Sequence, residues 1–191
     1  MASLLYIHGF LSSPLSFKAQ QVQAWLANAH PSIQYCCPQL SPYPLDTQDV
    51  LDRCVKQLPK PIYVMGSSLG GFWATWLVER YNLRALLINP AVSPQSFMPD
   101  YLHQPLRNYH NDETYCLTEA HIAEICEADV AVTRTENCWV LLQTGDETLD
   151  YRHAAEKYQG CLQTIEQGGD HSFTGFERYF EQSLTFFTRE S

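Results

Sequence analysis

A serine flanked by small residues lies between a strand-like and a helix-like segment in the first half of the chain. Residues 66–70 read Gly-Ser-Ser-Leu-Gly, with Ser68 at the centre of a Gly-x-Ser-x-Gly pattern. The preceding run 61–65 is apolar and β-branched, which is typical of a buried strand. In the residues that follow, apolar side chains recur at helical spacing: Leu69, Phe72, Trp73, Trp76 and Leu77. The sequence therefore predicts a sharp strand-to-helix turn at Ser68.

Such a turn has consequences for the chemistry of Ser68. It strains the backbone of the serine, which is tolerated only where the neighbours lack bulk, and Gly66 and Gly70 meet that need. The hydroxyl then lies above the carboxyl edge of the sheet, beside a helix N-terminus whose free N–H groups favour an anion. We therefore predict that Ser68 is a nucleophile. In the alternative, the serines only cap the helix, a role that fits Ser67 better.

The rest of the chain alternates between strand and helix patterns. Expected strands cover residues 3–8, 33–37, 61–65, 84–89, 138–144 and 162–166. Expected helices cover residues 16–29, 46–58, 69–81, 150–158 and 175–189, the second with Asp46 or Thr47 as its cap. Strands that alternate with helices imply βαβ units, and right-handed crossovers place helices on both faces of a parallel sheet. The expected fold is of the α/β class, a three-layer α/β/α sandwich with a mainly parallel sheet.

A long polar and aromatic segment, residues 93–136, interrupts this alternation. It contains a helix-like stretch from Thr118 to Cys126, whose start lacks the usual Glu or Gln at the third position. Connections of this length in compact domains are usually functional. We therefore expect one domain over residues 1–191, with residues 93–136 inserted as a cap over the site. In the alternative, the segment is a surface excursion without contact with substrate.

A serine hydroxyl needs a base to become a nucleophile, and the base needs an orienting carboxylate. Asp146 directly follows the strand-like run 138–144 and Gly145, at the strand end where ligand chemistry collects in open α/β sheets. It is the predicted carboxylate. Asp150, which opens a helix, and Glu147 compete with it, and a turn-forming role beside a glycine is also open to Asp146.

The base is sought among seven histidines. Only His171 follows the last expected strand, near the C-terminal end of the chain, and lies in a flexible turn, since Gly168 and Gly169 precede Asp170 and His171. Asp170 is expected to face away from the site and to close the turn. Five others lie at helix ends or in the inserted segment and are interpreted as surface or packing residues: His30, His103, His110, His121 and His153.

The loop after the first strand begins with His8, Gly9 and Phe10. In folds with a serine at a strand-to-helix turn, a His-Gly pair here positions one oxyanion donor, and the residue after the nucleophile supplies the other. The backbone N–H groups of Phe10 and Leu69 are therefore the predicted oxyanion hole. His8 and Gly9 are predicted to hold the loop.

Composition excludes several classes of partner. The net charge of −9 argues against nucleic acid and against anionic membrane surfaces. No apolar stretch approaches the ~20 residues that span a bilayer, and the N-terminus has no basic region, so we expect a cytoplasmic protein without stable membrane association. The seven cysteines lack metal-ligand spacing and are expected to be free thiols, with no metal or cofactor.

Four segments resemble the α/β-hydrolase superfamily and, more narrowly, the small bacterial YqiA/YcfP-type esterase family. They are residues 5–14 (LYIHGFLSSP), 66–71 (GSSLGG), 141–147 (LLQTGDE) and 168–173 (GGDHSF). The resemblance spans nearly the whole chain and is loose only in the inserted segment. It implies a reduced sheet of about six strands, because the first strand starts at the N-terminus and leaves no room for two antiparallel strands usual in the superfamily. It also implies carboxylesterase activity on short acyl esters.

These features together predict a serine hydrolase. Ser68, deprotonated by His171 with Asp146 behind it, attacks an ester carbonyl and forms an acyl-enzyme that water then hydrolyses. The same triad serves a thioesterase or an acyl transferase, and a hydrolase-fold protein that binds a small molecule or partner without turnover is a third possibility. The physiological substrate and the oligomeric state stay open at this point.

Overall fold

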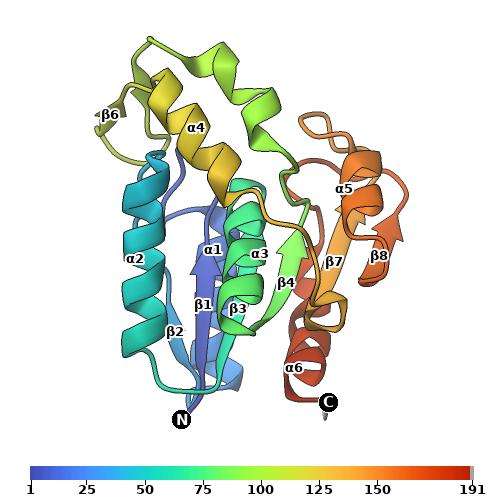
Figure 1. Cartoon of the computed structure of the whole chain (residues 1–191). Coiled ribbons are helices and arrows are strands. Elements are labelled where there is room, and N and C mark those ends of the chain that lie inside the picture. Colours follow the sequence, from blue (N-terminus) through green and yellow to red (C-terminus); the bar gives the residue numbers. More distant parts are fainter. Residues whose placement is uncertain (190–191) are drawn as a thin grey trace.

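The central sheet of the computed structural model, which describes residues 1–189, has six strands. They are β1 (Ser3–Ile7), β2 (Gln34–Cys36), β3 (Ile62–Ser67), β4 (Arg84–Ile88), β7 (Cys138–Gln143) and β8 (Leu162–Glu166). The spatial order is β2-β1-β3-β4-β7-β8, and each neighbouring pair is parallel. All carboxyl ends therefore lie at one edge, at the top of Figure 1. This confirms the predicted parallel sheet and its size.

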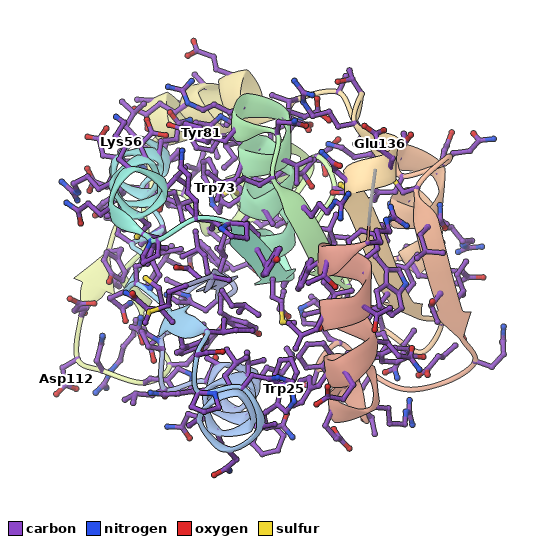
Figure 2. All side chains as sticks on the ribbon, turned by 90° about the horizontal axis from the view of Figure 1, so that it is seen from below. Trp25, Lys56, Trp73, Tyr81, Asp112 and Glu136 are labelled. Carbon is purple, nitrogen blue, oxygen red and sulfur yellow. The ribbon has the colours of Figure 1, made fainter. Side chains whose placement is uncertain are left out.

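Helices cover both faces of this sheet. One face carries α1 (Phe17–Ala29) and α6 (Phe180–Thr188), and the other carries α2 (Pro44–Gln57), α3 (Leu69–Tyr81) and α5 (Tyr151–Lys157). Figure 2 shows Trp25 of α1 beside α6, where its ring stacks on Phe180 with the ring centroids 4.8 Å apart. The predicted three-layer α/β/α sandwich is confirmed.

The four central strands, β1, β3, β4 and β7, are buried on both faces because helices cover each side of the parallel sheet, whereas the edge strands β2 and β8 are partly exposed. In β1, Leu5 and Ile7 pack on the side of α2 and α3, whereas Leu4 and Tyr6 pack on the side of α1 and α6. Every β1 residue is buried. The sequence segments of the central strands are therefore mostly apolar runs rather than alternating patterns.

Two helix boundaries differ from the prediction. Helix α2 begins at Pro44, so neither Asp46 nor Thr47 caps it. Proline suits a first helical turn because its missing N–H would have no acceptor within the helix there. The final helix, predicted over residues 175–189, is divided into a 3₁₀ turn, η4 (Phe176–Tyr179), and α6. Both differences leave the layers unchanged.

Residues 93–128 lie beyond the carboxyl edge of the sheet, across the top of Figure 1, and residues 129–136 run back from there to the amino end of β7. They form the 3₁₀ turns η1 (Pro94–Ser96), η2 (Met98–Tyr101) and η3 (Thr135–Asn137), the antiparallel pair β5 (Leu106–Arg107) and β6 (Thr114–Tyr115), and α4 (Glu119–Ala128). Helix α4 corresponds to the predicted helix-like stretch. At its start, Nδ1 of His121 accepts the backbone N–H of Thr118 at 3.0 Å, the part that Glu or Gln usually takes.

This segment is packed onto the rest of the molecule. Met98, Leu106 and Ile125 are buried in the same hydrophobic cluster as the inner sides of α2 and α3. At the base of the segment, Asp129 accepts hydrogen bonds from Ser93 Oγ at 3.2 Å and from Gln95 Nε2 at 2.9 Å, and it pairs with Lys157 of α5. The start of the segment is therefore held to the C-terminal end of α4. Within residues 1–189, no helix has the length and apolar character needed to cross a membrane.

Candidate active site

Ser68 occupies the turn between β3 and α3 with φ 56° and ψ −123°, a backbone conformation that is unfavourable for a residue with a side chain. Two glycines allow the close approach that the turn requires. A Cβ atom on Gly66 would collide with the backbone of Gly70, and one on Gly70 would collide with the carbonyl group of Ile7. The Ser68 side chain makes no capping bond, and Ser67 belongs to β3. The hydroxyl of Ser68 is thus available to other partners.

A continuous chain of hydrogen bonds links Ser68, His171 and Asp146. His171 Nε2 lies 3.1 Å from Ser68 Oγ, and its Nδ1 lies 2.8 Å from Asp146 Oδ2 and 3.0 Å from Oδ1. A carboxylate only accepts hydrogen bonds, so Nδ1 carries the proton and Nε2 is left as the acceptor for the serine O–H. The structure brings together the three residues that the sequence selected from three different loops.

The Asp146 carboxylate is held in place by the main chain. Its side chain is 2% exposed, and Oδ1 accepts the N–H groups of Thr148 at 2.9 Å and Leu149 at 2.8 Å. Burial raises the pKa of Asp146, but the hydrogen bonds from His171 and from these two N–H groups outweigh it and hold the pKa below its ordinary value. The group is therefore ionised and fixed in orientation, as a carboxylate that orients an imidazole must be.

The two competing carboxylates have other partners. Asp150 caps α5 by accepting the Arg152 N–H at 3.0 Å and also pairs with the Arg152 guanidinium. Glu147 accepts the backbone N–H of His171 at 3.0 Å, so it holds the main chain of that residue and not its ring. Of the three carboxylates that the sequence left open, Asp146 is the one in contact with the imidazole.

His8 holds the loop after β1. Its ring is buried, its Nε2 accepts the Leu40 N–H at 3.1 Å, and its Nδ1 lies 2.9 Å from the Gly9 carbonyl oxygen. Burial lowers the pKa of His8, which matches a neutral ring that donates from Nδ1 and accepts at Nε2. Gly9 runs close to the nucleophile, since a Cβ atom there would lie 3.4 Å from the Ser68 Cβ.

The two predicted oxyanion donors face the same space. Phe10 and Leu69 both line the cavity in front of Ser68. Neither backbone N–H donates a hydrogen bond to an atom of residues 1–189. This is expected for Leu69, the first residue of α3, because the first N–H groups of a helix have no acceptor within it. Phe10 lies in the loop after β1. Both N–H groups therefore belong to residues that line the cavity with Ser68 and have no acceptor within residues 1–189.

Two buried amides that the sequence analysis missed support the His171 loop. Asn89, at the end of β4, donates from Nδ2 to the carbonyl groups of Asp170 at 3.0 Å and His171 at 3.2 Å. Its Oδ1 accepts the backbone N–H of Gln143 at 3.0 Å, and Gln143 Oε1 accepts the Asp170 N–H at 3.1 Å. The available signal was a polar residue at the carboxyl end of each of two apolar strands, which a search for ionisable groups passes over.

A cavity of about 540 Å³ opens in front of Ser68 and His171, a size typical of small-molecule sites. The segment 93–136 forms one wall with apolar and aromatic side chains: Phe97, Met98, Tyr101 and Tyr109. Phe10 lies opposite, with its ring centroid 5.4 Å from that of Tyr101. Nothing in the sequence indicated that Lys18 belongs to the cavity lining.

The remaining predicted residues lie away from this cavity. Asp170 is outside the lining and closes the turn, because its carbonyl accepts the Phe173 N–H at 3.0 Å and its Oδ2 accepts the Thr174 hydroxyl at 2.8 Å. Among the described residues of the lining, His171 is the only histidine. The seven cysteines are free thiols, and residues 1–189 contain no cluster of three His, Cys, Asp or Glu side chains that is suited to a metal ion.

Sequence comparison places the chain in a family. The model of a family described as "Uncharacterised protein family (UPF0227)" matches residues 3–188. The chain belongs to this family. The UPF0227 protein YcfP of Salmonella paratyphi A is 24% identical over 191 residues, which cover 97% of this chain and 98% of that protein. The resemblance to YcfP-type proteins is thereby confirmed.

Solved structures show the same fold. Est1E from Butyrivibrio proteoclasticus, with ferulic acid bound, superposes with a TM-score of 0.71 at 15% identity over 97% of this UPF0227 chain and 88% of that chain. The α/β-hydrolase domain-containing protein 10 from mouse superposes with a TM-score of 0.69 at 16% identity, over 96% and 87% of the two chains. At this level of identity the likeness establishes the α/β-hydrolase fold and leaves the activity to be argued from the site.

Proposed function

We propose that this UPF0227 protein is a serine hydrolase that cleaves small carboxylic esters through an acyl-enzyme. The observation that carries the proposal is the unbroken hydrogen-bonded path from Ser68 Oγ through His171 to Asp146. Two further features support it. The strained backbone at Ser68 and the buried carboxylate of Asp146 each lower the stability of the fold, and both are typical of sites of nucleophilic catalysis.

The proposed reaction uses only groups of the chain, the ester and water. His171 Nε2 takes the proton of Ser68 while Oγ attacks the ester carbonyl, and the N–H groups of Phe10 and Leu69 bind the oxyanion. The C–O bond to the alcohol then breaks, and the alcohol leaves with the proton from Nε2. Water next gives a proton to Nε2 and attacks the acyl-enzyme, which releases the acid and restores Ser68.

The cavity supports an ester with an apolar part. Its wall from residues 93–136 is aromatic and apolar. Two hydrogen bonds join this segment to the loop after β1, here called the oxyanion loop (residues 8–14). The Asn108 amide donates to the Ser12 carbonyl at 2.8 Å, and the Tyr109 N–H donates to the Leu11 carbonyl at 2.8 Å. We include in the proposal that residues 93–136 act as a cap within a single domain. Ferulic acid, bound to the similar Est1E fold, is an aromatic acid of a size that fits a site of this kind.

The test is hydrolysis of a series of 4-nitrophenyl esters from acetate to octanoate, together with the matching thioesters, by wild type and Ser68→Ala. We expect wild type to hydrolyse the short esters, with kcat/KM reduced at least about a thousandfold in Ser68→Ala. Ser96→Ala, which alters an exposed serine outside the cavity, should match wild type. Higher kcat/KM for thioesters than for esters would assign the thioesterase reaction. If wild type and Ser68→Ala hydrolysed all of these substrates at the same low rate, both the esterase and the thioesterase function would be excluded.

A further inference from the structure

The cavity in front of Ser68 contains one cation. Among the described residues that line it, Lys18 is the only Lys or Arg, and no Asp or Glu belongs to the lining. The protein as a whole is strongly acidic, with a net charge of −9. The one charged side chain in the lining is therefore opposite in sign to the net charge of the molecule, and the nearby carboxylates of Asp146 and Asp170 lie outside the lining.

Lys18 is positioned next to the proposed base. It lies in the first turn of α1, and its Nζ donates to the carbonyl oxygen of Ser172, the residue after His171, at 2.7 Å. This is the only hydrogen bond of its ammonium group to an atom of residues 1–189. An ammonium has three N–H donors, so two of them are available to a molecule in the cavity.

Neither helix stability nor an ion pair accounts for this lysine. A cation in the first turn of a helix opposes the helix dipole. Lys18 has no carboxylate partner within 4.0 Å among residues 1–189, and the nearby Asp146 carboxylate already accepts bonds from His171, Thr148 and Leu149. Burial lowers the pKa of Lys18, although the charges of Asp170 and Asp146 oppose that effect. A partly desolvated cation with free donors is best satisfied by an anion.

The rest of the cavity indicates the other half of the ligand. Apolar side chains from the oxyanion loop, the segment 93–136 and the loop after β7 surround the space near Ser68, including Phe10, Phe97 and Leu149. We infer that the substrates are esters with an apolar body and one anionic group, a carboxylate or a phosphate, which Lys18 binds. This inference rests on the proposed ester hydrolysis and names its substrate class.

The test compares anionic and neutral esters of nearly equal size. One pair carries the charge on the acid half, mono-4-nitrophenyl adipate against its methyl ester. The other carries it on the alcohol half, 4-acetoxybenzoate against its methyl ester. In at least one pair, wild type should prefer the anion in kcat/KM by about tenfold or more, as expected for a charge pair in a partly desolvated site.

Substitutions of Lys18 separate charge recognition from support of the His171 loop. Lys18→Gln keeps a donor for the Ser172 carbonyl but removes the charge. The ratio of kcat/KM for the anionic ester to that for its neutral methyl ester should therefore fall to about one, mainly through a higher KM for the anion. Lys18→Arg should retain the preference. Lys56→Gln is the control, because it removes a positive charge from the outer side of α2, where Figure 2 labels Lys56. It should leave the preference for the anion and the KM values unchanged. An equal loss of kcat for both members of a pair in Lys18→Gln would overturn the inference and make Lys18 a support of the loop.

A binding measurement keeps this inference distinguishable from the proposed function. In Ser68→Ala, which cannot form an acyl-enzyme, calorimetry compares monomethyl adipate, an anion, with dimethyl adipate. We expect about tenfold tighter binding of the monoanion and loss of this difference when Lys18→Gln is added. Equal binding of the two esters would overturn the role of Lys18 even if wild type hydrolyses esters. Tighter binding of the anion by a protein without esterase activity would support Lys18 and overturn the proposed function instead.

Discussion

The carboxyl edge of the sheet and the segment 93–136 face the same cavity but are built in different ways. At the sheet edge, buried main-chain and amide groups fix the geometry: Asn89 and Gln143 are 2% and 3% exposed and hold the loop of His171. The segment 93–136 meets the oxyanion loop through a few polar contacts and one pair of rings, and Tyr109 at its rim is 74% exposed.

This difference separates two tasks. The edge sets the distances between Ser68, His171 and Asp146, which chemistry requires to within fractions of an ångström. The segment 93–136 supplies much of the surface that a substrate would contact. Changes at the edge should therefore affect kcat most strongly, and changes in the segment should affect KM and substrate preference. The predictions below test this division, starting with the largest expected effect.

Loss of the imidazole should have the largest effect on turnover. His171→Ala removes the proton acceptor of Ser68, and kcat for 4-nitrophenyl butyrate should fall at least about a thousandfold without loss of folded structure. Steady-state kinetics together with thermal unfolding check both parts. His153→Ala removes an exposed histidine of α5 as the control and should leave kcat unchanged. A rate in His171→Ala within tenfold of wild type would contradict the role of the edge.

Neutralising the carboxylate should have a comparable or slightly smaller effect. Asp146→Asn keeps the size of the side chain but no longer fixes the Nδ1–H tautomer of His171, so kcat should fall by about a thousandfold. Asp150→Asn, at a position where asparagine also caps a helix, should retain full activity and stability. The opposite pattern, with activity kept in Asp146→Asn and lost in Asp150→Asn, would show that the acid is misassigned.

Substitution of one buried asparagine in each region compares the sheet edge with the segment 93–136 most directly. Asn89→Ala leaves the Gln143 N–H and the carbonyl groups of Asp170 and His171 without a partner, which should lower the free energy of unfolding by about 2 kcal/mol or more and kcat by about tenfold or more. Asn108→Ala in the segment 93–136 removes the bond to Ser12 and should raise KM with kcat within about threefold. Urea unfolding and kinetics measure both variants, and equal effects on kcat would remove the distinction between edge and segment.

The smallest effect is expected at the aromatic wall. Tyr101→Ala removes the ring that packs on Phe10 and should raise KM for aromatic esters about two- to tenfold, the range of one aromatic contact, with little change in kcat. Tyr115→Ala is the matched control, since Tyr115 lies in the same segment and packs on Tyr43 outside the cavity. If Tyr101→Ala lowered kcat and left KM unchanged, the segment would act on the chemistry and not on binding.

The same two regions differ in how far the sequence predicts them. The central strands were recognisable because parallel strands covered on both faces are mostly apolar runs. The turn at Ser68 was recognisable because the close backbone approach there leaves no room for a side chain at Gly66 or Gly70. Asp146 and His171 followed from strand ends, which come together at one edge of any parallel sheet. The choice between Asp146 and Asp150 needed coordinates, because both follow the same strand within seven residues.

The cavity wall and the supporting amides were out of reach for a different reason. The turns and two-residue strands of the segment 93–136 have no periodicity, and their positions depend on long-range contacts such as those of Asp129 with Ser93, Gln95 and Lys157. Asn89 and Lys18 act through side-chain directions that no local pattern encodes. The sequence therefore indicated the residues of the proposed triad better than those that support them or line the cavity.

The most direct test of the central claim is labelling of Ser68 by a fluorophosphonate probe, with the modified peptide identified by mass spectrometry. The account predicts stoichiometric modification of Ser68 in wild type, none in Ser68→Ala, and slow modification in His171→Ala, because the probe reports an activated hydroxyl whatever the natural ester is. A folded wild-type protein that stays unmodified, or one modified equally fast with and without His171, would contradict the claim that His171 and Asp146 activate Ser68.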